Sequence, residues 1–468
     1  MDIIENRTFD ELRIGDTASL EHVLTDREAS LFATVTGVVA PIEDVSPDHV
    51  PPATARQGRS PHQGVWLEAL LAAAVETRLP GPGATTATQA LRFERPARIG
   101  DQVTLTLTVR EKRPGPGTVV LDCTATNQDG ERLLSGEMEV VAPRERQRRS
   151  LAPLPEEVAR DPRRRYRELV AKAKHGEPVA TAIVHPCSAV ALEGPLDAAR
   201  EGVIRPVLVG PQHRIEGIAA EAGLDISGLR MVDTPHSHAS ADRAVDLARR
   251  GEVAMLMKGS LHTSELMHAV LARATGLRTE RRISHACIMD VPAYDRPLIV
   301  TDAAINIQPD LLAKKDIAQN AIDMVRVLGR KLPKVAILSA VEEVNPAIPS
   351  TIDAAALCKM ADRGQITGAV LDGPLAFDNA ISAVAAKVKG IQTPVAGEVD
   401  ILLVPNLESG NMLAKQLVYL AGALSAGIVL GTQVPIVLTS RTDGKLERIA
   451  SCAIGALLAR AKATGGIK

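Results

Sequence analysis

Aromatic side chains are scarce in this chain of 468 residues, which holds one Trp, three Tyr and four Phe. Proteins that bind single-stranded nucleic acid stack bases on aromatic rings, so this scarcity argues against that class. A net charge of −2 likewise leaves no basic surface to attract nucleic acid. The core must therefore consist of Ala, Val, Leu and Ile, as is typical of parallel α/β sheets.

Cysteine is also rare, and no two cysteines form a CxxC pair. Their odd number and wide spacing argue against a disulfide framework and predict a reduced, cytoplasmic chain. The five positions are Cys123, Cys187, Cys287, Cys358 and Cys452.

Long hydrophobic runs are missing as well. The first residues lack a basic region followed by an apolar one, so no signal peptide is expected. The most apolar late segment, 417–430, contains Gly422 and Gly427 and is too short to span a bilayer. We expect it to form a buried helix that leads into a strand.

The length predicts two or three domains. Residues 143–156 are charged, interrupted by proline and without periodicity, so we expect a linker between domains at 1–142 and 157–468. The arginine run in this segment offers a second interpretation, binding of an anionic partner, although such runs are more often solvated.

Residues 1–142 carry the patterns of an α+β layer. Thr25 and Glu28 have the spacing of a capping box, which predicts a helix start. A longer helix is predicted near 61–79, where Val65, Trp66, Leu70, Leu71 and Val75 share one face. Strand patterns follow, and we expect their antiparallel sheet to wrap around the long helix. These strands are predicted at 104–109, 119–126 and 138–142.

After the linker, short apolar runs alternate with helical patterns, which predicts a mostly parallel, doubly wound α/β sheet. Ligands of such sheets bind at the carboxyl ends of the strands. Polar residues follow the predicted strands at 258–260, 301–302, 372–374 and 440–441. The strands are predicted at 180–184, 205–210, 253–257, 297–301, 334–339, 368–372, 401–404 and 435–438.

Ser440 and Arg441 follow the last predicted strand, where a helix start would leave backbone N–H groups free for a phosphate. An arginine at such a position can hold phosphate with two parallel hydrogen bonds. Asp443 and Glu447 lie close by in the sequence, and this combination suits acyl or phosphoryl chemistry. The alternative is a simple helix cap made by Ser440 and Asp443.

Lys258, Gly259 and Ser260 also follow a strand and could meet a phosphate. The alternative is a turn into a helix that starts near Thr263. The histidines at 236, 238, 262 and 268 do not have the spacing of a metal site. The phosphate-binding glycine motifs of dinucleotide and nucleotide triphosphate sites are missing too.

Residues from about 156 to 468 resemble the phosphate acetyl/butyryltransferase family. The resemblance implies two α/β subdomains flanking a cleft, similar to isocitrate and isopropylmalate dehydrogenases. It also implies the reaction acyl-CoA + phosphate ⇌ acyl phosphate + CoA, with coenzyme A as a substrate and no permanent cofactor or metal. The blocks that carry the resemblance are 257–264, 359–366, 371–378, 404–411 and 435–441.

The same resemblance implies roles for single residues. Ser440 and Arg441 match the pair that serves the acyl phosphate. Glu447 stands where related acetyltransferases have the Asp that takes the thiol proton, and Asp443 is the nearer alternative. The residues expected to bind substrate are Lys258, Gly259, Ser260, His262, Thr263, Asp372, Gly373 and Asn411.

Residues from about 8 to 142 resemble a MaoC-like dehydratase domain with a hotdog fold, through 32–37, 64–66, 77–83 and 91–101. Active hydratases of this type carry Gly-Asp-x-Asn-Pro-x-His, and residues 37–43 match that segment. Val38, Ala40 and Glu43 replace its Asp, Asn and His, so the acid–base pair is missing.

We therefore expect a hydratase-dead domain that binds acyl-CoA, dimerises or acts as a scaffold. Two alternatives stay open: a bifunctional enzyme that uses Glu43 or His49, and a non-catalytic CoA-binding protein. Because hotdog sheets commonly pair side by side, a dimer or a larger even assembly is expected.

Overall fold

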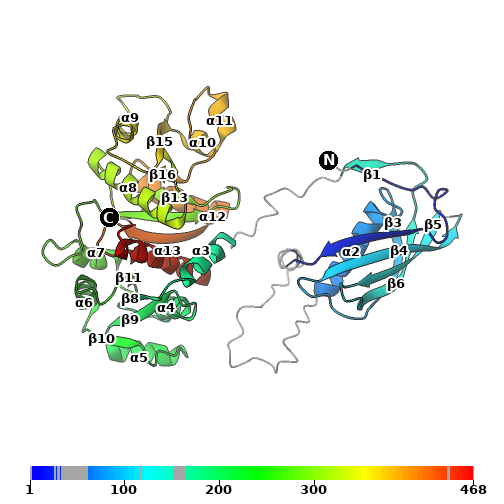
Figure 1. The fold of residues 1–468 in the computed structure, drawn as a ribbon, viewed down its shortest axis with the longest axis horizontal. Helices are drawn as coiled ribbons and strands as arrows, with labels where there is room; N and C mark the ends of the chain where they lie inside the picture. Colours follow the sequence, from blue (N-terminus) through cyan, green and yellow to red (C-terminus); the bar gives the residue numbers. More distant parts are fainter. Residues whose placement is uncertain are drawn as a thin grey trace. The chain divides into compact units, whose positions relative to one another are not determined.

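The computed structural model describes residues 3–25, 28, 32, 62–115, 117–150, 164–439 and 443–466. The chain divides into two compact units, Met1–Ala159 and Arg160–Lys468 (Figure 1). The expected hydratase positions Val38, Ala40, Glu43 and His49 lie outside the described residues, as do Ser440 and Arg441.

The smaller unit packs one long helix, α2 (His62–Thr77), on a five-stranded antiparallel sheet, as predicted. Trp66, Leu67 and Leu71 of α2 belong to the same buried cluster as Leu105 and Leu107 of β4. The predicted capping box is confirmed, because the Thr25 amide donates to Glu28 Oε2 (3.0 Å) and the Glu28 amide donates back to Thr25 Oγ1 (3.2 Å). In sheet order, the strands are β2 (Thr17–Val23), β4 (Gln102–Arg113), β5 (Thr118–Thr126), β6 (Arg132–Val141) and β3 (Thr85–Phe93).

The first part of the expected linker belongs to this smaller unit. Strand β7 (Arg148–Ser150) pairs antiparallel with β1 (Ile3–Glu5), and the Phe9 amide donates to the Pro143 carbonyl at 2.9 Å. Arg146 forms ion pairs with Glu5 and Glu11, so this arginine of the run is held by carboxylates of its own unit.

The larger unit contains an eleven-stranded sheet, and its mostly parallel character is confirmed. All neighbouring strands are parallel except three consecutive pairs, β18–β17, β17–β12 and β12–β13. In sheet order, the strands are β10 (Arg230–Asp233), β9 (Ile204–Gly210), β8 (Val179–Val184), β11 (Met255–Lys258), β18 (Ile436–Val437), β17 (Leu424–Leu430), β12 (Ser284–Asp290), β13 (Leu298–Thr301), β16 (Ile401–Leu403), β14 (Lys334–Leu338) and β15 (Val370–Leu375).

The three antiparallel junctions divide the parallel strands into two sets that run in opposite directions. The first set comprises β10, β9, β8, β11 and β18, and the second comprises β13, β16, β14 and β15. The carboxyl ends of the first set therefore point to the same edge of the sheet as the amino ends of the second. Polar residues that follow strands of different sets leave the sheet in opposite directions.

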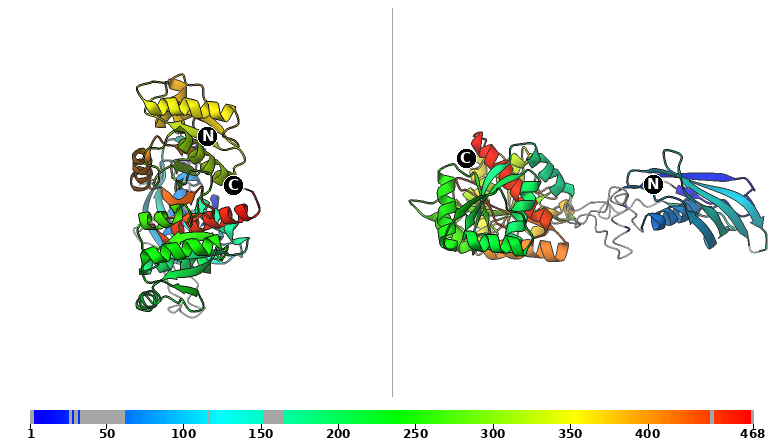
Figure 2. Two further views of the ribbon diagram at one scale, coloured as in Figure 1. Left: turned by 90° about the vertical axis from the view of Figure 1, so that its left-hand side faces the viewer. Right: turned by 90° about the horizontal axis from the view of Figure 1, so that it is seen from below.

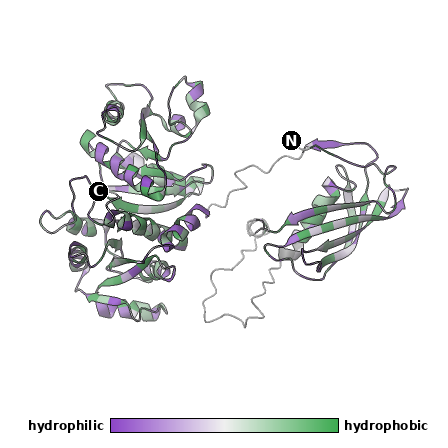
Figure 3. Ribbon diagram, viewed as in Figure 1, coloured by the Kyte–Doolittle hydropathy of each residue, from purple (hydrophilic) through white to green (hydrophobic). Residues whose placement is uncertain are grey.

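Helices cover both faces of this sheet (Figures 1 and 2). Successive residues of β8 bury into different clusters, Ile183 on one face and Ala182 and Val184 on the other, so both faces are apolar (Figure 3). The helices are α3 (Arg164–Lys174), α4 (Ala189–Arg200), α5 (Gln212–Glu221), α6 (Ser237–Arg249), α7 (Thr263–Leu271), α8 (Leu311–Leu328), α9 (Pro349–Asp362), α10 (Phe377–Ile381), α11 (Ala383–Val388), α12 (Leu407–Ala421) and α13 (Lys445–Ala463).

The apolar segment 417–430 forms the end of α12 and then β17, as predicted. The helix end is not buried, however, because Tyr419 is 70% and Leu420 84% exposed. Gly422, in the left-handed conformation at φ 64°, ends the helix. Among the described residues, no helix is long and apolar enough to cross a membrane.

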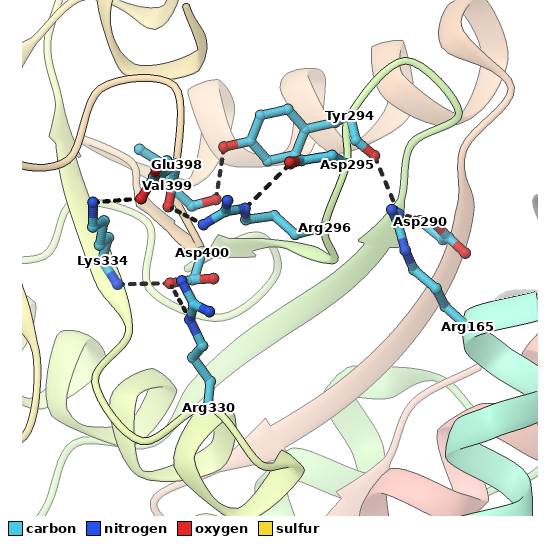
Figure 4. Close-up of polar contacts among 10 residues, drawn as sticks. All are labelled: Arg165, Asp290, Tyr294, Asp295, Arg296, Arg330, Lys334, Glu398, Val399 and Asp400. Atoms are coloured by element: carbon cyan, nitrogen blue, oxygen red, sulfur yellow. Dashed lines mark hydrogen bonds and ion pairs between the residues drawn. The ribbon is translucent and has the colours of Figure 1, made fainter. Parts of the chain in front are cut away.

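Charged side chains fix the amino ends of the second set (Figure 4). The buried carboxylate of Asp400 accepts hydrogen bonds from the Lys334 amide (2.8 Å) and Arg330 Nε (3.4 Å). Arg165 of α3 donates to Asp290 at the end of β12 (2.6 Å). In each of these contacts both the donor and the acceptor are groups of the protein, which indicates a structural role.

Candidate active site

The chain segments that follow β11 and β18 lie side by side at the carboxyl ends of the first set. In the register of β11 and β18, Leu256 pairs with Ile436 and Met257 with Val437. Lys258 and Leu438 come next on each strand, and neighbouring strands are about 4.8 Å apart. The segment 258–260 therefore begins beside the residues that lead to position 440.

Backbone contacts hold the segment 258–260 tightly. The amides of Gly259 and Ser260 donate to the carbonyls of Val184 and His185, each at 2.9 Å. A Cβ at position 259 would lie 2.4 Å from the Val184 oxygen, so only glycine fits. Ser260 Oγ is 2.9 Å from Ser188 Oγ, which joins this loop to the start of α4.

His185 is a residue that the sequence did not single out. It is buried, it has a positive φ of 55°, and its Nδ1 lies 3.1 Å from Ser240 Oγ. A non-glycine residue in this region is uncommon and often marks a functional site. Burial, reinforced by Arg214, lowers the pKa of His185, which favours the neutral imidazole.

The loop after β11 ends where α7 begins, and the predicted helix start at Thr263 is confirmed. The Glu265 carboxylate accepts from the His262 amide at 2.8 Å. His262 and Thr263 thus lie at the helix start directly after the 258–260 segment.

The helix that follows β18 starts later than the sequence predicts. Helix α13 begins at Lys445 with Gly444 as its N-cap, and because Ser440 lies outside the described residues, the alternative cap of Ser440 and Asp443 stays a prediction. Glu447 Oε2 accepts from the Gly444 amide at 2.6 Å. In the sequence, Asp443 lies three residues after Ser440, and Glu447 lies three residues after Gly444. The cap that the structure shows is formed by Gly444 and Glu447.

Both carboxylates expected as a base lie near the buried side chains of α3 and β12. Burial is the main cause that raises the pKa of Tyr166 well above its usual value, and Glu447 and Asp443 add to it. Burial, with Asp302 and Asp443, raises the pKa of Cys287 to about 12. Tyr166 donates to the Ile288 carbonyl at 2.7 Å. The charges of Asp443 and Glu447 therefore act on Tyr166 of α3, and that of Asp443 also acts on Cys287 of β12.

None of the five cysteines has the properties of a nucleophile. Burial raises the pKa of Cys123, Cys358 and Cys452 to about 12, as it does for Cys287, and it also raises that of Cys187. These side chains remain thiols at neutral pH, whereas the thiolate is the reactive form. Any thiol chemistry here needs a thiol from the substrate.

The remaining residues expected to bind substrate lie elsewhere in the sheet. Asp372 and Gly373 are on the edge strand β15, seven strand spacings from β11, or about 34 Å along the sheet. Asn411 of α12 donates to the Ala303 carbonyl (3.2 Å) just after β13. These residues and Lys258 cannot touch one phosphate group, because they belong to different parts of the sheet.

No group of three or more His, Cys, Asp or Glu side chains in the described part of the chain could hold a metal ion.

Comparisons with known proteins identify the family of the chain. Residues 240–456 match the family model described as "Phosphate acetyl/butaryl transferase". A phosphate acetyltransferase of Rhizobium meliloti is 59% identical over 295 residues, which are 63% of this chain and 93% of that protein. A phosphate butyryltransferase of Clostridium acetobutylicum is 40% identical and is matched over 98% of its length, across 63% of this chain.

A crystal structure of a branched-chain phosphotransacylase from Enterococcus faecalis V583 is also similar. It is 29% identical to this chain, with a TM-score of 0.53, and the match covers 99% of that structure and 60% of this chain.

Proposed function

Because the chain belongs to the phosphate acetyl/butyryl transferase family, it is a phosphate acyltransferase, and we propose that its centre lies at the carboxyl edge of the first set. The proposed reaction is acyl-CoA + phosphate ⇌ acyl phosphate + CoA. The observation that carries this location is the register of β11 and β18, which joins the 258–260 loop to the residues before Ser440.

Each proposed role follows from the chemistry of the reaction. The thiol of CoA attacks the carbonyl of the acyl phosphate, and a carboxylate that removes its proton makes it a nucleophile. Ser440 donates to the oxyanion that forms, and Arg441 offsets the charge of the departing phosphate. Lys258 and the hydroxyl of Ser260 are proposed to meet the substrate phosphate, because the amides of Gly259 and Ser260 already donate to the carbonyls of Val184 and His185.

The base is proposed to be Glu447 or Asp443. Glu447 is fixed at the start of α13 by the Gly444 amide, and the carbonyl of Asp443 accepts from Arg448 Nη1 at 3.0 Å. Both residues lie close to Ser440 in the sequence.

We propose that the enzyme prefers acetyl to butyryl substrates. The acetyltransferase relative is 59% identical, whereas the butyryltransferase relative is 40% identical. The two opposed strand sets support the finer architecture, in which two subdomains flank a cleft.

One assay tests the proposed site: CoA consumption with acetyl phosphate and with butyryl phosphate. Ser440→Ala should lower kcat by roughly 10²–10³, the usual effect of losing one oxyanion donor. Glu447→Gln and Asp443→Asn in the same assay identify the base as the variant with the larger loss. Near-normal turnover of the Ser440 variant would refute its role.

For the smaller unit we propose a hotdog domain without hydratase activity, extending to about residue 150. The antiparallel sheet packed on the single long helix α2 supports this fold. Among the described strands, β3 has a neighbour on one side only, β6, and this open edge supports assembly into an even-numbered oligomer.

A further inference from the structure

His185 joins several segments of the chain through its backbone. Its amide donates to the Val209 carbonyl at 2.7 Å, which links the end of β8 to β9. Its carbonyl accepts from the Cys187 amide at 2.8 Å and from the Ser260 amide at 2.9 Å. The position of the 258–260 loop therefore depends on where the His185 carbonyl points.

An uncommon backbone conformation sets the direction of this carbonyl. His185 has a positive φ of 55°, which is unfavourable for a residue with a side chain unless its surroundings hold it there. The side chain is held, because Nδ1 lies 3.1 Å from the hydroxyl oxygen of Ser240 in α6. Both residues are buried. The imidazole thus anchors the strained backbone to a neighbouring helix.

The protons of this cluster follow from a count of donors and acceptors. Ser240 Oγ contacts the His236 carbonyl at 2.9 Å. It also lies 2.8 Å from Thr234 Oγ1, in addition to the contact with His185 Nδ1. A carbonyl can only accept, so the single hydroxyl proton of Ser240 goes to His236. Ser240 then accepts from Thr234 and from His185, which places a proton on Nδ1. Thr234, Ser240 and His185 therefore form one hydrogen-bonded chain.

We propose that His185 is a positioning residue for the 258–260 loop. The hydrogen-bonded chain holds the imidazole, the imidazole holds the left-handed backbone, and that backbone directs its carbonyl to the Ser260 amide. Without this anchor, Lys258 and the Ser260 hydroxyl would lose their fixed position toward the phosphate. The imidazole itself does not touch the substrate. This inference rests on the proposed role of Lys258 and Ser260 in meeting the substrate phosphate.

The test is steady-state kinetics of the full chain in the direction of acyl phosphate formation, with acetyl-CoA and inorganic phosphate. Release of the CoA thiol gives the rate. His185→Gly adopts the left-handed conformation without strain but removes the anchor. KM for phosphate should rise about tenfold, the effect of losing one hydrogen bond to a charged group, while KM for acetyl-CoA changes less than about twofold. Ser240→Ala should have the same effect, and it decides the matter if His185→Gly does not fold.

His185→Asn separates positioning from direct contact with the substrate. Asn tolerates a positive φ, and its amide nitrogen can donate to Ser240 from the same place in the side chain as Nδ1, but it has no atom in place of Nε2. We expect KM for phosphate within about twofold of the wild-type value. Thr181→Val in β8 is the matched control, because it also removes a buried hydroxyl, which donates to the Val179 carbonyl at 2.9 Å. It should leave both KM values unchanged.

A wild-type KM for phosphate in folded His185→Gly or in Ser240→Ala would overturn the inference. A tenfold rise in His185→Asn would overturn it too, because the ring would then act on the substrate directly. The proposed role of the loop has its own test, since it fails if Lys258→Ala leaves KM for phosphate unchanged. The two failures are therefore distinguishable.

Discussion

His285 illustrates how single residues in this fold are tuned by burial. It lies on β12 between the two strand sets, and it is 6% exposed. Nδ1 is 3.8 Å from Cys287 Sγ, and burial lowers the pKa of the imidazole although Asp302 opposes the shift. The folded chain therefore holds His285 in its neutral form.

This shift predicts a pH dependence of stability. An unfolded chain protonates His285 below about pH 6.5. The folded chain resists that proton, so the free energy of unfolding falls as the pH drops below this value. Urea titrations at about pH 7.5 and 5.5 should show a smaller loss for His285→Gln than for wild type. Equal losses in the two proteins would contradict this account, because all other titrating groups are common to both.

Helix α13 shows at the scale of elements why close packing restricts sequence. It packs against α3, α4 and β17. Gly455 is a point of close approach, since a Cβ there would lie 2.2 Å from Met255 Sδ and 3.2 Å from the Val437 side chain. A larger residue at this position requires the buried Met255 side chain or the helix to move.

Gly455→Ala should therefore destabilise the larger unit by about 1–3 kcal/mol, the usual effect of overpacking. The measurement is the free energy of unfolding in urea. Gly217→Ala in α5 is the control, because nothing lies within 4 Å of its added Cβ. That change should stabilise the helix by about 0.5–1 kcal/mol. If Gly455→Ala left the free energy of unfolding unchanged or raised it, α13 would be able to shift freely, which would contradict this account.

Elements with a strong local pattern could be predicted from the sequence, and others could not. Strand β4 alternates buried and half-buried residues and was predictable, whereas β3 is exposed along almost its whole length. Strand β12 was missed because Ser284 and His285 at its start and Asp290 at its end leave only four apolar residues between them. The start of α13 was misplaced because Ser440 and Asp443 have the same spacing as Gly444 and Glu447.

Some residues of the candidate site could likewise be predicted from the sequence, and others could not. The 258–260 loop was found because its signal is local, a strand followed by Lys, Gly and Ser. Tyr166 was missed because its partner Ile288 lies 122 residues away. The strand directions that separate Asp372 from Lys258 also come only from long-range pairing.

At the scale of the whole molecule, each unit has its own hydrophobic core. The full chain should not hydrate crotonyl-CoA, because Val38 has no proton to transfer. Absorbance of the enoyl thioester measures this, with CoA consumption as evidence of active protein. The triple change Val38→Asp, Ala40→Asn and Glu43→His restores the residue types of active hydratases and serves as the comparison. Robust hydration by the wild-type chain would contradict the proposal.

Strand β18 has a consequence for biosynthesis. It separates β11 from β17, yet its residues are made some 180 positions after their partners in β11. During translation, the edge of β11 that pairs with β18 stays unpaired until the final tenth of the polypeptide leaves the ribosome. A prematurely terminated product would thus expose a template for aggregation rather than a partly working enzyme.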